Sequence, residues 1–416
     1  MALFQYWLIE PSFLFSLIFL VIFLRITFKL KPRKSSSLNL LPSPPKLPII
    51  GNLHQLSTNK PHISFHKLAQ KYGPIFSLQL VKYLFYDCTD LGYSPYGAYY
   101  RYIRKICTLE MPSPARIQSF KFVQEEEVAL KLPLSWSIPT SQQHTKFKIT
   151  LNPLGSSKGV AFGRDFTSGG DYEKQGFKKM LEEHQILLGG LSLGDFFPSI
   201  DFMHKLTGMK SKLVHTSKRF DQLINEDIFA AGTGTIFISL DWAMTELVMN
   251  PKAMEKAQAE SDLPHLNYMQ AIIKETYRLH PPAPLLMPRP ALEDVTIDGC
   301  KIPAKTRIYI NAWGMERDPK VWEDPKTFKP ERFIGSNIDF KGTSLELIPF
   351  GAGRRSCPGI NFGTACFGLA LAQLLHSFDW ELPPGVKAKD LDMHELFSIT
   401  MHRKECLVVL AKPHFA

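Results

Sequence analysis

The sequence has few cysteines, and their spacing excludes several classes of protein. The 416 residues include six cysteines, and no two of them form a C-x-x-C pair or another clustered ligand spacing. So sparse a set argues against a disulfide scaffold and against an iron–sulfur cluster, and it places the main body in a reducing compartment. The sequence also lacks internal repeats and zinc-finger spacing, so no motif indicates nucleic-acid binding.

The charge is unbalanced toward the basic side, with a formal net charge of +10. Such a charge suits an acidic protein partner, an anionic membrane surface or nucleic acid, and it is equally compatible with an ordinary basic surface. The hydrophobic fraction of 44% is that of a globular protein. The length allows one large core or two smaller ones.

Residues 1–31 are interpreted as a membrane anchor with a basic flank. Residues 11–24 are uncharged and nearly all apolar, residues 1–9 are apolar except for one glutamine, and only Glu10 separates the two runs. Together they are long enough to cross a bilayer, and the basic residues that follow place the rest of the chain in the cytoplasm. A cleaved signal peptide is the alternative, but the charges flank the wrong end and no small-residue cleavage site follows Leu24.

The anchor is followed by a hinge and then by the body of the protein. Residues 32–51 are basic and proline-rich, and prolines at this density make a stiff, extended linker. Residues 52–416 form the body. Within it, residues 60–72 predict an amphipathic helix, residues 75–80 alternate like a strand, and residues 99–110 predict a second helix. Two short strands are predicted further on, at residues 302–311 and 405–411.

The most informative segment is residues 349–359, where a cysteine precedes a proline and a run of small and apolar residues that predicts a helix through Leu375. Proline is tolerated at the first helical position, so Cys357 is expected at the mouth of this helix. Backbone N–H groups and the helix dipole favour negative charge there, which predicts a thiolate, the form that ligates metals. Glycines in the segment allow backbone to approach a flat partner closely, and Arg354 and Arg355 can neutralise its acidic groups.

This segment resembles the haem-binding loop of the cytochrome P450 family, whose pattern is Phe-x-x-Gly-x-Arg-x-Cys-x-Gly. The five fixed positions are filled by Phe350, Gly353, Arg355, Cys357 and Gly359. The resemblance implies that Cys357 is the axial ligand of the iron of haem b and that the other four residues belong to the cofactor site. A structural cysteine buried behind a turn is the alternative.

The resemblance covers nearly the whole chain from Pro42 onward and looks like a plant microsomal member of the group that oxidises specialised metabolites. It implies a mainly α fold with small β-sheets, preceded by one N-terminal transmembrane helix. It also implies a monooxygenase that inserts one oxygen atom from O2 into a lipophilic small molecule. Electrons would come from NADPH through a membrane-bound reductase, and the protein would reside in the endoplasmic reticulum membrane with its catalytic domain facing the cytoplasm.

The longest helix is predicted over residues 220–250, and its middle is apolar on all sides, as in a buried helix. It resembles the distal helix of the family, in which an acid and a threonine help deliver protons to bound oxygen. Thr235 matches the threonine, but Gly234 stands where the family has the acid. Phe229 and Ala230, on the same helix, are assigned by the resemblance to the substrate pocket.

Three further residues are assigned to the cofactor by the resemblance. Tyr100 and Arg104 lie four apart and share a helical face. They match a tryptophan and an arginine of the family, with the arginine bound to a haem propionate, and a solvated basic face is the alternative. Arg289 matches another arginine that reaches a propionate.

Glu275 and Arg278 lie three apart on a helix predicted over residues 264–280. With Arg332 they match a buried charge triad of the family, whose role is structural. Removing one member would leave a buried charge without its partner. Leu285, Leu286 and Phe397 are assigned to the substrate pocket by resemblance alone, with core packing as the default.

The chain is shorter than the family pattern at two places. A hairpin and a helix normally follow the position of Leu80, and an extra segment normally follows that of Asp262. Together with Gly234, these gaps favour a catalytically impaired or non-catalytic haem-binding relative as an alternative. The lost acid at Gly234 also suits a third alternative, an isomerase or dehydratase of the same fold that needs no reductase, but the retained Thr235 argues against it. A faulty gene model would also account for the gaps.

Overall fold

The computed structural model describes residues 41–47, 51–56, 60–78, 96–98, 100–102, 104–105, 147–150, 227–260, 266–397 and 400–413. The predicted anchor, residues 1–31, lies outside these ranges, as does the first part of the predicted hinge. Among the described residues, no helix combines the length and the apolarity needed to cross a bilayer.

Apolar runs and prolines mainly determine where the described helices lie and where they begin and end. Pro251 begins one helix directly after another ends at Met249, because proline cannot continue a helix but fits its first turn. The α-helices are α2 (Pro61–Tyr72), α11 (Asp227–Met249), α12 (Pro251–Ala259), α13 (Asn267–Leu279), α14 (Ala312–Met315) and α15 (Ile360–Ser377). The 3-10 helices are η1 (Leu53–Gln55), η4 (Pro330–Phe333), η5 (Gly353–Arg355) and η6 (Ala388–Asp390).

In the described part of the chain, the strands are short and form four small antiparallel sheets. The largest has the order β1-β9-β6, with Ala411 of β9 paired to Phe147 on one side and to Trp380 on the other. Its strands are β1 (Phe147–Thr150), β6 (Phe378–Glu381) and β9 (Val408–Pro413). The others are the pairs β2 (Arg289–Pro290) with β5 (Arg307–Ile308), β3 (Val295–Ile297) with β4 (Cys300–Ile302), and β7 (Glu395–Phe397) with β8 (Met401–Arg403).

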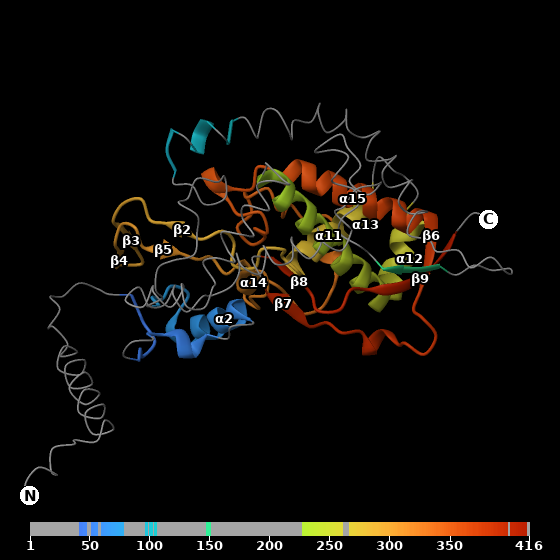
Figure 1. The fold of residues 1–416 in the computed structure, drawn as a ribbon, viewed down its shortest axis with the longest axis horizontal. Coiled ribbons are helices and arrows are strands. Elements are labelled where there is room, and N and C mark those ends of the chain that lie inside the picture. The colour runs from blue at the N-terminus through green and yellow to red at the C-terminus, as the bar shows by residue number, and fades with distance from the viewer. Residues whose placement is uncertain are drawn as a thin grey trace, which may run out of the picture.

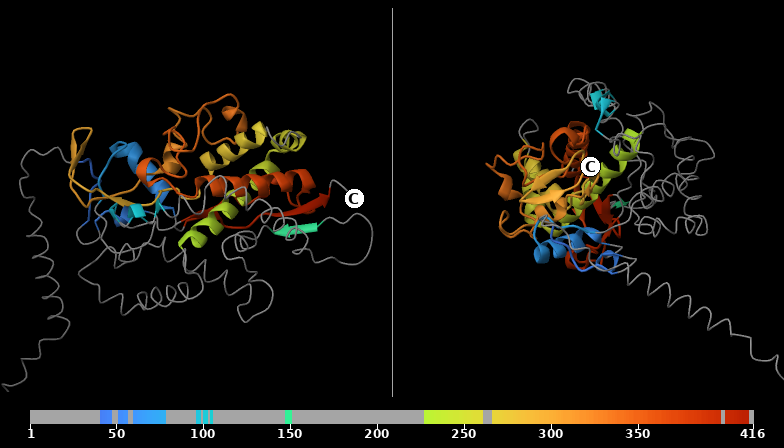
Figure 2. Two further views of the ribbon diagram at one scale, coloured as in Figure 1. Left: turned by 90° about the horizontal axis from the view of Figure 1, so that it is seen from above. Right: turned by 90° about the vertical axis from the view of Figure 1, so that its left-hand side faces the viewer.

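The core lies where α11, α13 and α15 pack against one another. Figures 1 and 2 show these helices side by side, with the β1-β9-β6 sheet at one end and the β2 to β5 strands at the other. Each fully buried aliphatic or aromatic side chain contributes about 1.5–3 kcal/mol. Fully buried core residues include Met244, Leu247, Ile272, Ile273, Phe367 and Leu371.

Several predicted elements differ from the structure. Residues 75–78 form no strand, and the N–H of Ser77 instead donates to the carbonyl of Pro42 at 2.8 Å. The alternation was misleading because a strand needs a partner, and none lies beside it in the described ranges. The strand predicted over residues 302–311 is broken by a turn at Lys305, whose φ is 66°. The helices predicted at 60–72 and 264–280 are confirmed within a few residues, and so is the described part of that predicted at 220–250.

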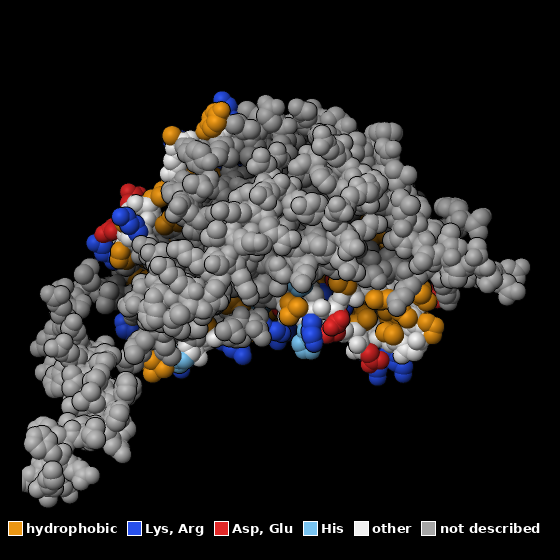
Figure 3. All heavy atoms as spheres, viewed as in Figure 1, with side chains coloured by type: hydrophobic (Ala, Val, Ile, Leu, Met, Phe, Trp, Pro, Cys, Tyr) orange, Lys and Arg blue, Asp and Glu red, His pale blue; other side chains and the backbone are white. Residues whose placement is uncertain are grey.

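The described surface in Figure 3 mixes basic, acidic and apolar side chains. On this face the described residues form no large patch of one sign.

Candidate active site

The segment from Ile348 to Gly359, called the cysteine loop below, is held in shape by backbone hydrogen bonds. The N–H of Gly351 donates to the carbonyl of Ile348 at 2.9 Å, and the N–H of Cys357 donates to the carbonyl of Phe350 at 2.8 Å. Gly351 has a φ of 69° and Gly353 one of 67°, which glycine adopts at little cost. The loop therefore turns back on itself just before Cys357.

Phe350 fastens the cysteine loop to the core. Its ring meets those of Tyr277 and Phe340 at centroid distances of 5.0 and 5.7 Å. Aromatic pairs at such distances add about 0.5–1.5 kcal/mol beyond the buried area.

The helix after the loop begins later than predicted. Pro358 was expected at the first helical position, but α15 starts at Ile360, with Gly359 as its N-cap. The N–H of Gly359 bonds to the sulfur of Cys357. The first turn of the helix therefore supports the thiol through one directed amide hydrogen bond.

The pKa of Cys357 is shifted in the opposite direction to the one expected from its place at a helix N-terminus. Burial raises the pKa of the thiol above its ordinary value, while the Gly359 N–H and the positive charge of Arg104 lower it only in part. Cys357 nevertheless remains accessible and forms no disulfide. Desolvation by the surrounding protein therefore outweighs the stabilisation of negative charge at the helix N-terminus.

Tyr100 and Arg104 lie against the cysteine loop rather than on a solvated face. Residues 100–102 and 104–105 have helical backbone, and Tyr100 is only 2% exposed. Arg104 donates to the Tyr100 hydroxyl at 3.0 Å and to the carbonyl of Ser356 at 2.6 Å. The guanidinium of Arg355 lies 3.7 Å over the Tyr100 ring. Tyr100, Arg104, Arg355 and Cys357 are thus brought together.

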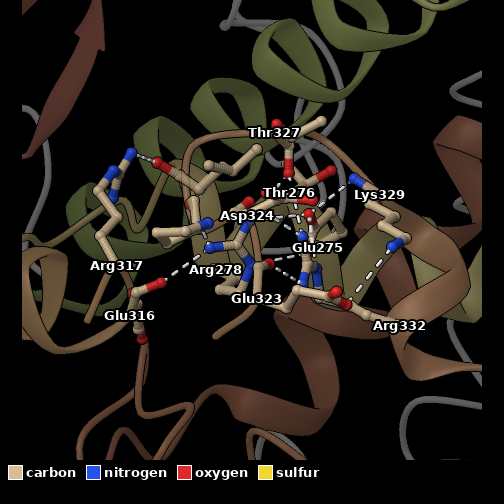
Figure 4. Close-up of polar contacts among 12 residues, drawn as sticks. Glu275, Thr276, Arg278, Glu316, Arg317, Glu323, Asp324, Thr327, Lys329 and Arg332 are labelled. Carbon is tan, nitrogen blue, oxygen red and sulfur yellow. Dashed lines mark hydrogen bonds and ion pairs between the residues drawn. The ribbon is translucent and has the colours of Figure 1, made fainter. Parts of the chain in front are cut away.

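The structure also brings Glu275, Arg278 and Arg332 together, as Figure 4 shows. Glu275 accepts from Arg278 through both oxygens, at 2.7 and 2.8 Å, and from Nε of Arg332 at 3.1 Å. Arg278 has no exposed surface, and its remaining N–H groups reach the carbonyls of Glu316, Pro325 and Thr327. All five of its donors have an acceptor, which a buried guanidinium requires.

Leu285 and Leu286, both assigned to the substrate pocket, have different surroundings in the structure. Leu285 is 7% exposed and packs in a small core with Leu56 and Phe65, so it is a packing residue in the structure. Leu286 has a left-handed backbone with a φ of 49°, which costs a branched residue energy. Its Cδ1 lies 3.9 Å from where a Cβ on Gly351 would be, so Leu286 faces the cysteine loop.

The remaining assigned residues are placed by their elements. Gly234 is buried and Thr235 half-buried on α11, where the carbonyl of Thr235 accepts from the hydroxyl of Ser239 at 2.9 Å. Phe229 and Ala230 lie on the same helix and Phe397 on β7, but their side chains lie outside the described part. Arg289 lies in β2, opposite Ile308, and is half-buried.

Sequence reasoning missed several buried polar residues. Arg403 of β8 donates to the hydroxyl of Thr245 at 2.7 Å and lies 3.6 Å from the carboxylate of Asp241. The available signal was the four-residue spacing of Asp241 and Thr245 on an otherwise apolar helix. Glu316, directly after α14, is fully buried, and no pattern in the sequence around it predicts a buried carboxylic acid.

The residues around Cys357 fit a haem group. An accessible thiol that accepts one amide hydrogen bond is a suitable axial ligand, and two guanidinium groups beside it suit the carboxylates of a porphyrin. The glycines of the loop leave room for a flat group, since a Cβ on Gly353 would meet no atom within 4 Å. A mainly helical fold with such a cysteine defines the class of haem-thiolate proteins.

Comparison with known proteins identifies the family within this class. The profile of the cytochrome P450 family matches residues 41–93 and 226–410. Cytochrome P450 71AP13 of Prunus mume is 50% identical, with 100% of this chain and 98% of that protein covered. Strychnine-11-hydroxylase of Strychnos nux-vomica is 36% identical, with 96% and 97% covered. Premnaspirodiene oxygenase of Hyoscyamus muticus is 34% identical, with 96% and 98% covered. The chain belongs to the cytochrome P450 family, a family of monooxygenases that use haem b and electrons from NAD(P)H delivered by a reductase.

The chain is shorter than its relatives. The alignment with the Prunus mume protein spans 507 positions, whereas this chain has 416 residues, so 91 positions are filled by the relative alone. The partial match of the family profile agrees with internal deletions, as the sequence predicted.

Proposed function

We propose that this chain is a haem-thiolate monooxygenase that inserts one oxygen atom from O2 into a lipophilic small-molecule specialised metabolite. Its electrons would come from NADPH through an NADPH–cytochrome P450 reductase. The observation that carries the proposal is the position of Cys357, an accessible thiol beside Arg104 that accepts the Gly359 N–H at the head of α15.

Cys357 would hold the haem iron, and Gly359 would keep the sulfur oriented through its N–H. Arg104 and Arg355, with Arg289, would bind the propionates, and Tyr100 would support Arg104 through its hydroxyl and Arg355 through its ring. The buried Glu275–Arg278–Arg332 triad would hold rigid the segments leading to the cysteine loop. When bound, haem supplies the activation of O2, with thiolate ligation favouring O–O cleavage.

The chain's own residues would bind the substrate and exclude water. The apolar middle of α11, with Phe229 and Ala230, would form one wall, and Leu286 and Phe397 would approach from other elements. An apolar pocket of this kind suits a lipophilic substrate. Leu285 would support Leu286 from the packed side. Thr235 would hold a proton near the reacting oxygen with its hydroxyl.

The reductase would dock beside the cysteine loop. Arg101, Lys105 and Arg354 are exposed there and line one hollow with Tyr96, Tyr100 and Arg104. A basic surface next to the haem ligand would attract an acidic electron donor. Residues 1–31 would anchor the protein in the endoplasmic reticulum membrane and residues 32–51 would form the hinge. The shortened domain of residues 52–416 would then face the cytoplasm.

Replacing the proposed ligand tests the assignment. Cys357→Ala should abolish the thiolate-type absorption of the reduced, CO-bound protein together with all oxygenase activity. Cys406→Ala, which changes an exposed cysteine elsewhere, should leave the spectrum intact. Retention of the thiolate spectrum by the Cys357 variant would disprove the assignment.

Gly234 favours a second candidate, a reductase-independent isomerase or dehydratase, or an impaired haem-binding relative. The residue beside Thr235 carries no carboxylate to help move protons. Substrate conversion at the same rate with and without NADPH and reductase would support the isomerase or dehydratase. A normal thiolate spectrum without any conversion would indicate the impaired relative.

A further inference from the structure

Glu316 is a buried carboxylic acid that the proposed reaction does not use. It directly follows α14 and has 0% exposed surface. Its Oε1 accepts the N–H of Ile348 at 3.1 Å, and its Oε2 is buried with no hydrogen-bond partner in the described part of the chain. A buried polar atom without a partner is costly. An apolar side chain at this position would avoid the cost of the unpaired Oε2. The stabilisation that Glu316 provides must therefore come from the hydrogen bond that Oε1 accepts from Ile348.

The backbone of Glu316 is tied to the ion triad. Its carbonyl accepts from Nη1 of Arg278 at 2.9 Å, and Arg278 is held by both carboxylate oxygens of Glu275. Figure 4 shows Glu316 beside Arg278 and Arg317 in this network. Because Arg278 cannot move without losing buried bonds, the backbone position of Glu316 is set firmly.

The side chain of Glu316 bonds to Ile348, the first residue of the cysteine loop, and so lies on the side away from Arg278 in this series of contacts. Ile348 is 4% exposed, and its carbonyl accepts the N–H of Gly351, where the loop turns. The carbonyl of Phe350 then accepts the N–H of Cys357. A short series of hydrogen bonds and covalent links therefore joins Arg278, Glu316, Ile348 and Cys357.

We propose that Glu316 is a positioning residue that fixes the start of the cysteine loop, and thereby Cys357, relative to the Glu275–Arg278–Arg332 triad. The link to haem ligation rests on the proposed function, whereas the effect of Glu316 on the loop does not. Burial raises the pKa of Glu316 well above its usual value, and the charges of Arg317 and Arg278 and the Ile348 N–H lower it only in part. A neutral side chain with one acceptor oxygen is therefore sufficient.

Amide hydrogen exchange of the full-length protein, followed by mass spectrometry, tests the proposal. Glu316→Met keeps the volume but removes the acceptor, and it should accelerate exchange at residues 348–357 by about fivefold or more, as expected for a lost buried hydrogen bond. Glu316→Gln keeps the acceptor and should exchange like the parent. Glu316→Asp shortens the side chain by one methylene, so its carboxyl should no longer reach the Ile348 N–H, and exchange at residues 348–357 should be as fast as in the Met variant. If the Met variant does not fold, the Asp variant provides the test in its place.

Asp241→Leu is the matched control. Asp241 is 3% exposed, accepts the N–H of Leu407 at 3.1 Å and lies 3.6 Å from Arg403, so its loss is at least as disruptive as that of Glu316 but lies far from the cysteine loop in sequence. This variant should accelerate exchange near Leu407 but not at residues 348–357. Equal exchange in the Met and Gln variants, or equal acceleration of the loop by Asp241→Leu, would overturn the proposal.

A spectrum separates this proposal from the proposed function. The reduced, CO-bound protein should show a smaller thiolate fraction in Glu316→Met and a parental fraction in Glu316→Gln. If the Cys357→Ala variant retains the thiolate spectrum, the haem-ligand assignment fails while the exchange result still decides the role of Glu316. A Met variant with fast loop exchange and an unchanged thiolate fraction would overturn the link from Glu316 to Cys357.

Discussion

At the scale of single residues, the cysteine loop has all the groups expected of a cofactor site, whereas α11 lacks the acid expected beside Thr235. The cysteine loop has its thiol, its supporting amide and its neighbouring guanidinium groups in contact distance. On α11 the hydroxyl of Thr235 is retained, but Gly234 next to it offers no acid. A positioned acid or base contributes about 10²–10⁴-fold to a proton-transfer step. The position of Gly234 is therefore expected to limit coupling rather than cofactor binding.

Introducing the acid should improve the use of electrons. We expect Gly234→Asp to raise the ratio of product formed to NADPH consumed, because a carboxylate beside Thr235 can supply protons. The measurement is product and peroxide per NADPH in a haem-loaded preparation with reductase. Gly234→Ala is the control, since it gains about 1 kcal/mol of helix propensity without an acid. Equal coupling in the Asp variant and the parent would show that Gly234 is not a defect in proton delivery.

Glu316 should make stability depend on pH. Burial raises its pKa in the folded state above the ordinary value of 4.5. The stability that it supports is therefore complete below about pH 4.5 and is lost as the pH rises toward its folded-state pKa. Glutamine has no proton to lose. The free energy of unfolding of Glu316→Gln minus that of the parent should thus grow by about 1.4 kcal/mol per pH unit above pH 4.5, up to that pKa.

Unfolding by urea at pH 5, 6 and 7 measures this difference. Glu323→Gln is the control, because the Glu323 side chain is 84% exposed. Parallel pH curves for the parent and Glu316→Gln would contradict the assigned state of Glu316.

At the scale of elements, one side chain at the end of α12 provides the N-terminal cap of α13. The N-cap residue of α13, Leu266, provides no side-chain cap. Glu260 fills this role from the end of α12, because its two oxygens accept the N–H groups of Tyr268 and Met269 at 2.8 and 3.0 Å. A carboxylate at a helix N-terminus satisfies unpaired donors and complements the dipole. The shortened connection thus still starts α13 correctly.

Removing this cap should weaken the helix that carries the ion triad. We expect Glu260→Ala to lower the free energy of unfolding by about 1 kcal/mol, as the loss of an N-cap commonly does. Glu255→Ala, at an exposed position of α12, should cost less. Denaturation curves of the two variants and the parent make the comparison. A smaller loss for Glu260→Ala than for Glu255→Ala would rule out the capping role.

At the scale of the whole molecule, the site is held mainly by one part of the chain. Residues 266–397 contain the triad, the cysteine loop, α14 and α15, and α11 packs against α13 and α15. Outside this part, the described residues that contact the loop include Tyr96, Tyr100 and Arg104. Removing the proposed anchor, which precedes this part of the chain, should therefore separate membrane binding from cofactor binding.

Deleting residues 1–34 should move much of the protein from the membrane pellet to the soluble fraction while haem content is kept, because the proposed anchor lies outside the proposed haem-binding domain. Carbonate-washed membranes and the haem absorbance of each fraction provide the measurement. Glu10→Leu, which makes the apolar run continuous, should remain in the pellet. Complete retention of the truncated protein in washed membranes would refute a single N-terminal anchor.

The sequence by itself determined the family, the mainly helical fold and the short segment around Cys357 as the candidate haem-binding loop. These follow from local patterns, because a ten-residue motif and an apolar helical run keep their meaning wherever they lie in space. The approximate positions of α2, α13 and α15 also followed, since proline, glycine and hydrophobic periodicity act over a few residues.

The tertiary structure alone decided properties that depend on neighbours distant in sequence. The pKa of Cys357 rises because surrounding protein desolvates the thiol more strongly than the helix terminus stabilises its charge. Residues 75–78 form no strand, and the N–H of Ser77 bonds instead to the carbonyl of Pro42, 35 positions earlier in the sequence. Glu316 is joined to Ile348, 32 positions away, by a contact that no local pattern encodes. Burial and hydrogen-bond partners are set by the folded arrangement, and for that reason these features could not be predicted from the sequence.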